Sequence, residues 1–305
     1  MKISTLLLAL ATLIAFAANS ILCRLALMSE NIGALEFTAF RLASGIIILL
    51  PLILLHKNKH VYDAASKNVD PLKIRFSNFY QAAALFGYAL FFSLAYIQLE
   101  AGTGALILFA SVQITMIGVS LVRGNKVTLP EWTGVIISFS GLIYLLSPGF
   151  SAPPVLGTAF MIASGVSWGI YSLLGKDQPQ PILSTARNFL FCLPGVVVLA
   201  LIIFGKSMQT GHVKMNADGI ILAVSSGALA SGLGYVLWYL TVQKITTVSA
   251  SVIQLAVPVL VAIGGVLLLD ESLTLRLALA SILIIGGIII AICGRNAPEP
   301  LNRQH

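Results

Sequence analysis

Two arginines, Arg41 and Arg187, lie within long apolar runs, about 145 residues apart. A charged side chain costs about 2.5–3.5 kcal/mol at the centre of a membrane helix and less near its ends. Two roles fit such a residue: contact with an anion in a cavity, or a hydrogen bond to the end of a neighbouring helix. Each arginine stands within a turn or two of an expected helix end. We therefore favour a structural or gating role for both.

Two glutamines, Gln113 and Gln254, also lie deep in apolar runs. An amide in hydrocarbon must find hydrogen-bond partners, and a central cavity offers water or substrate. The alternative is an interhelical hydrogen bond, worth about 0.6–2 kcal/mol. Both interpretations remain open.

Aromatic side chains form a third group with possible binding chemistry. Tyr88, Trp168 and Tyr235 lie deep in their runs, where rings stack on planar or cationic solutes. Others, namely Tyr96, Trp238 and Tyr239, lie near the ends of runs, where such residues usually anchor a helix at the membrane interface. Pro258 removes one backbone hydrogen bond and is expected to kink its helix, as a hinge or cavity bend.

The composition shows which elements must position these residues. The chain is 58% hydrophobic and 10% charged, against about 25% charged residues in a soluble domain. Apolar runs of membrane-spanning length recur from end to end. We therefore predict an all-α polytopic membrane protein in a lipid bilayer. The net charge of +7 comes from lysines and arginines in loops, which indicates topology and not nucleic-acid binding.

We expect ten spans, the first of them a retained helix and not a signal peptide. Lysine and arginine concentrate in alternate loops so that both termini are expected in the cytoplasm, with the protein in the plasma (inner) membrane. The expected ranges are 3–23, 33–55, 78–98, 102–122, 130–147, 155–175, 184–204, 218–241, 246–269 and 274–293.

The ten spans divide into two similar halves, residues 1–150 and 151–295, followed by a cytoplasmic tail, 296–305. Laid over each other, the halves bring glycines, span starts and the two arginines into register. Five is an odd number, so the second half must enter the membrane in the opposite orientation. Two opposed copies form an inverted repeat, as in many secondary transporters.

Several segments resemble the drug/metabolite transporter superfamily, in its ten-span EamA-type branch. The Trp-Gly pair of that family is present as Trp168-Gly169, whereas the first half has Asn19-Ser20, and Glu271 fits the family's glutamate. The resemblance implies export of small metabolites, amino acids or their analogues, by a monomer or weak homodimer. The segments that carry it are TAFRL at 38–42, IQLAVPV at 253–259, LLLDESLTL at 267–275 and Gly286-Gly287.

The sequence lacks the residue patterns that metal binding, phosphate binding and hydrolytic catalysis require. The three cysteines are far apart and follow no metal-ligand spacing, and we find no phosphate-binding loop, HExxH motif or serine–histidine pair. We therefore expect no cofactor, no metal and no enzyme activity. All carboxylates fall at span ends or in loops, so none is expected near the midplane, where an ion-coupled carrier often has one.

The sequence thus predicts a secondary transporter with a midplane cavity that alternates between the two sides. A neutral cavity of amides and aromatics favours zwitterionic or aromatic solutes. The alternatives are a multidrug or quaternary-cation exporter and, from another class, a non-transporting membrane protein or membrane enzyme. The cavity candidates are Asn19, Tyr88, Gln113, Trp168, Tyr235 and Gln254, and the structural or gating candidates are Arg41, Arg187, Pro258 and Glu271.

Overall fold

The computed structural model is built of helices throughout the part of the chain that it describes. That part comprises residues 3–62, 76–124, 127–146, 153–176, 178, 180–211, 214–269 and 275–293. It contains no strand, only one isolated bridge between Ile32 and Met215. Eight of its helical stretches are long and apolar enough to cross a bilayer, which takes about 20 residues. The chain is a multi-pass membrane protein.

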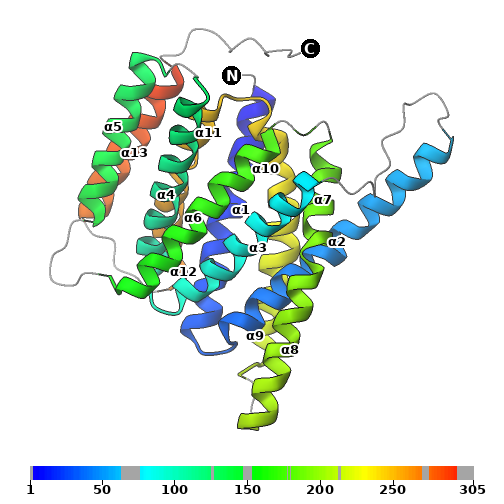
Figure 1. Cartoon of the computed structure of the whole chain (residues 1–305). Coiled ribbons are helices and arrows are strands. Elements are labelled where there is room, and N and C mark those ends of the chain that lie inside the picture. Colours follow the sequence, from blue (N-terminus) through cyan, green and yellow to red (C-terminus); the bar gives the residue numbers. More distant parts are fainter. Residues whose placement is uncertain are drawn as a thin grey trace.

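Helices coincide with all ten expected ranges (Figure 1). The first half contains α1 (Ile3–Met28), α2 (Ala34–Tyr62), α3 (Phe76–Tyr96), α4 (Ala101–Val122) and α5 (Leu129–Leu146). The second half contains α6 (Val155–Lys176), α7 (Pro181–Phe191), α8 (Leu193–Thr210), α9 (Ala217–Ser225), the π-helix η1 (Ser226–Leu233), α10 (Gly234–Val242), α11 (Thr247–Ile253), α12 (Ala256–Leu268) and α13 (Leu275–Cys293). The eight span-forming stretches do not include α5 or the whole of α13, which contributes the shorter apolar stretch 282–291.

Some helix ends differ from the expected ones. Helix α1 continues five residues beyond the range that its apolar run predicted and so includes Arg24. The Arg24 guanidinium donates a hydrogen bond of 3.1 Å to the Tyr96 carbonyl at the end of α3. Arg24, expected in a loop, therefore lies within a helix, and its carbonyl partner allows the helix to continue past it.

Three long stretches are interrupted, each for a local reason. Proline lacks an N–H and its ring clashes with the carbonyl four residues earlier. Pro194 stands in the first turn of α8 and separates that helix from α7. Pro258 separates α11 from α12, and the break falls at Gln254 and Leu255, four and three residues before it. In the third stretch, η1 widens the helix between α9 and α10.

The two halves pack against each other in a reciprocal way. We number the five expected spans of each half in chain order. For most contacts between a helix of one half and a helix of the other, the helices with the exchanged span numbers are also in contact. Helix α3 packs on α6 while α1 packs on η1 and α10, and α4 packs on α6 while α1 packs on α12. Three further contacts join corresponding helices directly: α2 with α7, α4 with α11 and α12, and α5 with α13.

Helices α5 and α13 form a close pair at one edge of the molecule (Figure 1). Glycines allow this approach: a Cβ placed on Gly287 would lie 2.6 Å from the Gly134 carbonyl oxygen. The hydroxyl of Ser138 donates a hydrogen bond of 3.2 Å to the Ile284 carbonyl in the same contact. Small residues let membrane helices pack through their backbones, which supplies van der Waals contact where no hydrophobic driving force exists.

Replacing Gly287 tests this pairing. We expect Gly287→Ala to lower the free energy of unfolding by about 1–3 kcal/mol, because the added methyl group overlaps backbone atoms of α5. Gly286→Ala is the matched control, since a Cβ at Gly286 meets nothing within 4 Å. Thermal unfolding in detergent measures both variants. Equal melting temperatures for the two would contradict the close contact.

Candidate functional site

Six polar and aromatic side chains converge inside the bundle, and we call them the central cluster. They come from both halves of the chain and from six helical stretches. All are buried, with exposed fractions of 5% or less. The members are Asn19 on α1, Arg41 on α2, Tyr88 on α3, Trp168 on α6, Tyr235 on α10, and Gln254 at the break between α11 and α12.

Arg41 has polar and aromatic partners in this cluster. Its Nε donates a hydrogen bond of 2.9 Å to the Ser231 hydroxyl, and its Nη2 donates one of 2.6 Å to the Tyr235 hydroxyl. The guanidinium carbon lies 5.1 Å from the centroid of the Tyr88 ring and 4.9 Å from that of Phe92. The partners of this side chain are thus hydroxyls and rings, not carbonyls at a helix end.

The charge of Arg41 has no counter-charge among the described residues. No carboxylate there forms an ion pair with it, and its Nη1 has no hydrogen-bond partner, although the side chain is only 1% exposed. Removing such a charge from water costs several kcal/mol. A cation–π contact returns about 0.5–2 kcal/mol. The expectation that the cavity candidates have neutral surroundings is therefore wrong, because Arg41 of α2 lies against Tyr88 and Tyr235.

Hydroxyl and amide groups link Arg41 to α1. The Tyr235 hydroxyl donates to the Tyr88 hydroxyl at 3.2 Å, and the Asn19 amide donates to the same Tyr88 oxygen at 3.1 Å. The other end of the Asn19 amide, Oδ1, accepts hydrogen bonds from Ser226 at 2.6 Å and Ser231 at 3.3 Å. Asn19 therefore joins the first half of the chain to the wide turn of the second.

The sequence pattern does not indicate Ser226 and Ser231 as partners of Asn19, and the reason is the π-helix. Residues five apart lie about 140° apart around an α-helix at 3.6 residues per turn. In a π-helix the same spacing is close to one turn, so both side chains face one way. Both serines are in η1 and both donate to the same oxygen of Asn19. A helical wheel drawn with the α period would separate them.

Trp168 and Gln254 form the second polar contact of the cluster. The indole Nε1 donates to Gln254 Oε1 at 2.8 Å, and Gln254 Nε2 donates to the Ala250 carbonyl at 2.9 Å. The Trp168 ring lies 4.8 Å from that of Tyr88 and 4.7 Å from that of Tyr235, measured between centroids. Phe16 contacts the same ring from α1 at 5.1 Å. The cluster therefore has an aromatic side next to its arginine.

The described side chains of the central cluster pack closely together in this structure. The void beside the cluster measures only about 10 Å³ and is lined by Phe16, Ser20, Tyr88, Leu108, Phe109 and Trp168. That is too small for any solute larger than water. The side chains of the cluster must therefore move apart before a ligand can bind among them.

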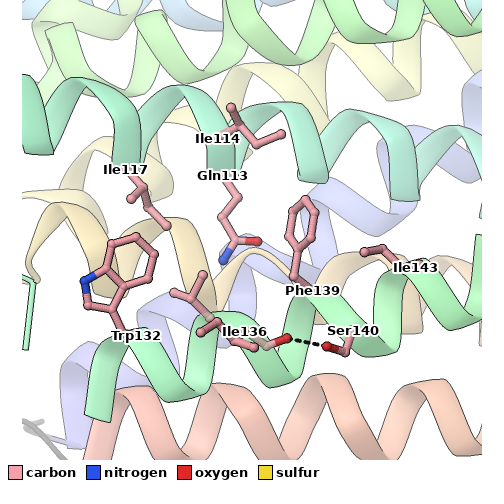
Figure 2. Close-up of a pocket in the computed structure, with 9 residues that line it drawn as sticks. Gln113, Ile114, Ile117, Trp132, Ile136, Phe139, Ser140 and Ile143 are labelled. Carbon is pink, nitrogen blue, oxygen red and sulfur yellow. Dashed lines mark hydrogen bonds between the residues drawn. The ribbon is translucent and has the colours of Figure 1, made fainter. Parts of the chain in front are cut away.

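Gln113 lies away from the central cluster. Its side chain leaves α4 toward α5 and borders a cavity of about 430 Å³ between these helices (Figure 2). The lining is apolar apart from Gln113 and Ser140, and Ile114, Ile136 and Ile143 are largely exposed on the outside of the bundle. Both polar atoms of the Gln113 amide are buried without a hydrogen-bond partner in the described part of the chain.

The remaining candidates occupy separate places. Arg187 is buried on α7, which packs on α2 and α3. Pro258 is buried in the first turn of α12, one turn from Gln254. Glu271 and the tail 296–305 lie outside the described residues.

Three aromatic residues expected at the membrane interface are instead buried within the protein. Tyr96, Trp238 and Tyr239 are each 1% exposed or less. The Trp238 indole donates to the Ser172 hydroxyl at 2.9 Å, and the Tyr239 hydroxyl donates to the Tyr171 carbonyl at 3.1 Å. The expectation of interface anchors was wrong because these polar groups find partners on a neighbouring helix and so need no interfacial water.

Two comparisons of sequence show similarity to membrane transporters. The chain matches the EamA-like transporter family over residues 3–147 and again over residues 155–293. An uncharacterized protein of Pseudomonas aeruginosa is 41% identical over 291 residues, which cover 95% of each chain. A protein of Escherichia coli named a probable amino-acid metabolite efflux pump is 23% identical over 216 residues, 68% of this chain and 72% of that one.

The fold is also found in a solved structure. A crystal structure superposes with a TM-score of 0.68 and covers 94% of this chain and 99% of that chain. The two sequences are 20% identical, so the likeness shows a shared fold.

The two glutamines differ in environment, and this difference predicts opposite effects on stability. Gln254→Leu removes the acceptor of the buried Trp168 N–H, so we expect a loss of about 1–3 kcal/mol in the free energy of unfolding. Gln113→Leu removes a buried amide without a described partner and is expected to leave stability unchanged or raise it. Thermal unfolding in detergent compares them. Equal losses in the two variants would contradict these environments.

Proposed function

The chain belongs to the EamA-like transporter family and is a membrane transporter, not an enzyme, and from this premise we propose that it exports small metabolites such as amino acids or their analogues. Transport would take place by alternating access through a midplane cavity at the central cluster. The proposed location is the plasma (inner) membrane with both termini in the cytoplasm, because lysine and arginine concentrate in the loops of that side.

The observation that carries this proposal is the central cluster. Asn19, Arg41 and Tyr88 come from the first half, and Trp168, Tyr235 and Gln254 come from the second. Hydrogen bonds from Arg41 to Tyr235 and from Ser226 to Asn19 cross between the halves. Polar side chains within a membrane bundle mark substrate pathways because burying them is costly. A shift of one half against the other would separate these groups and open a cavity between them.

Two inverted five-helix repeats are the architecture that we propose for this mechanism. The reciprocal contacts support it: a pairing such as α3 with α6 has a counterpart in α10 with α1 when the halves are exchanged. The family also matches the chain twice, once in each half. In such transporters the repeats exchange conformations, so that one closed end opens as the other closes.

Two connections contact each other at one end of the bundle, and we call this contact the clasp (residues 29–33 and 214–216). The Asn216 N–H donates to the Asn31 carbonyl at 2.9 Å, and the Asn216 side-chain amide donates to Asn31 Oδ1 at 2.8 Å. Lys214 lies 2.8 Å from Glu30, and this contact lowers the pKa of the Glu30 carboxyl below its usual value. The clasp joins the halves, so alternating access would require it to open.

The relative from Escherichia coli supports amino-acid metabolites as the substrate class. The arginine in the central cluster disfavours lipophilic or quaternary cations, because like charges repel in a poorly solvated site. We therefore place a multidrug-cation exporter second to an exporter of amino acids or their analogues.

Counterflow in proteoliposomes tests the proposed function. Vesicles loaded with each of the common amino acids in turn should take up the labelled form of the transported ones faster than protein-free vesicles. Trp168→Ala should reduce this uptake at least tenfold, since it removes both a ring surface and the partner of Gln254. The variant must elute as a folded protein in detergent for the comparison to count. No counterflow with any amino acid or analogue would overturn the proposal.

Cross-linking the clasp tests alternating access. In a protein carrying Asn31→Cys and Asn216→Cys, a short bifunctional thiol reagent should arrest transport, because the two connections could no longer separate. Each single-cysteine variant treated with the same reagent serves as a control. Full transport in a protein shown by peptide mapping to be cross-linked would contradict a gate at this end.

A further inference from the structure

We propose that Arg41 is the site that binds the carboxylate of the transported solute, which makes the substrate class an amphipathic monocarboxylate. The inference rests on the proposed function and deepens it. It starts from a side chain that is 1% exposed, lies in the central cluster and has an unpartnered Nη1 among the described residues.

The donors of Arg41 are arranged for a planar anion. A guanidinium presents five N–H groups in a rigid fork that matches the two oxygens of a carboxylate. In this structure two of its nitrogens donate to single hydroxyls, Ser231 at 2.9 Å and Tyr235 at 2.6 Å. A hydroxyl oxygen accepts one of these bonds but brings no negative charge. A carboxylate would accept two of them and neutralise the cation as well.

The neighbours of Arg41 also fit an anion. The hydroxyls of Ser231 and Tyr235, which now accept from the arginine, can rotate to donate to a carboxylate oxygen. Tyr88 contributes a third hydroxyl, which accepts from Asn19 and Tyr235. Among the described residues, no carboxylate forms an ion pair with Arg41. A bound carboxylate would therefore not compete with one of these side chains for the guanidinium. An arginine with a purely structural role would be expected to have such a partner or a set of carbonyl acceptors.

The rest of the cluster limits the solute to one negative charge and an apolar or aromatic portion. Beyond Arg41, the cluster consists of amides and of rings, with no second cation. The rings of Phe16 and Trp168 lie 5.1 Å apart, and Tyr88 lies 4.8 Å from Trp168. Such rings hold an apolar side chain and can face an ammonium group by a cation–π contact. Dicarboxylates and phosphate esters would bring charge that this cluster does not match.

Carboxylate binding would also change contacts between the halves. Arg41 belongs to the first half, and its two hydroxyl partners belong to the second. A carboxylate that takes their place on the guanidinium replaces a direct bond between α2 and the η1–α10 segment by a bond to the solute. Occupancy of the site is thereby linked to the separation of the halves on which alternating access depends.

Matched solutes that differ at the carboxylate test this inference. Leucine, threonine and phenylalanine are compared with their amides, which lack the carboxylate, and with their N-acetyl derivatives, which retain it and lack the ammonium group. Each unlabelled solute is added in competition with a labelled amino acid in counterflow. The wild-type protein should prefer the acids and N-acetyl acids over the amides by about 10- to 100-fold, the range for a hydrogen bond to a charged group.

Variants of Arg41 separate recognition from folding. Arg41→Gln should abolish the preference for the acid while the amide still competes. Arg41→Lys keeps the charge but loses the fork, so it should raise the half-saturating concentration of the acid about tenfold and leave that of the amide unchanged. Arg187→Gln, at the other buried arginine, should retain the wild-type preference. If Arg41→Gln does not fold, the lysine variant and the wild-type preference still decide the question.

The outcomes distinguish two failures. A wild-type protein that accepts amides as well as acids overturns the carboxylate site but leaves amino-acid export intact. An unchanged preference in folded Arg41→Gln or Arg41→Lys does the same. A wild-type protein that transports none of the acids, amides or N-acetyl acids overturns the proposed function itself.

Discussion

The interaction on which the centre of this structure depends is the set of bonds around one buried guanidinium. Arg41 is only 1% exposed, and its charge is met by hydroxyls and rings. Such a charge in a membrane bundle is tolerable only where surrounding dipoles are fixed. Asn19 holds Tyr88 and Ser231 in place, and Tyr88 in turn accepts from Tyr235. Asn19, Arg41, Tyr88 and Tyr235 therefore form one hydrogen-bonded unit spread over both halves of the chain, and the Trp168 ring packs against it.

Two of the three helix irregularities lie at the central cluster. The π-helix brings Ser226 and Ser231 onto one face toward Asn19, and the break that Pro258 imposes falls at Gln254, the acceptor of the Trp168 indole. Regular helices would present these residues on other faces. Wide turns and proline breaks cost backbone hydrogen bonds, and in transporters they occur where polar backbone borders a cavity. Their position here supports the proposal that the halves separate at the cluster.

Away from the centre, two helix contacts differ in how closely they pack. Helices α5 and α13 meet through the Gly134–Gly287 backbone contact, whereas α4 and α5 leave a cavity of about 430 Å³ at Gln113. The first contact is tight and made of small residues, so it suits a fixed edge of the bundle. The second is loosely filled and opens among exposed isoleucines. The bundle thus combines a close-packed pair at its edge with the centre at which we propose that a solute binds.

The sequence by itself determined the membrane class and the positions of the helices, because apolar runs of bilayer length are a property of local composition. It also indicated that Tyr88, Trp168, Tyr235 and Gln254 are buried, because they lie within such runs. Only the tertiary structure decided which of these residues meet. It placed Gln113 away from the cluster, brought Ser226 and Ser231 into contact with Asn19, and buried Tyr96, Trp238 and Tyr239. The physical reason is rotation about the helix axis: one widened turn or one proline break changes the face that every later residue presents, and a hydropathy pattern does not record it.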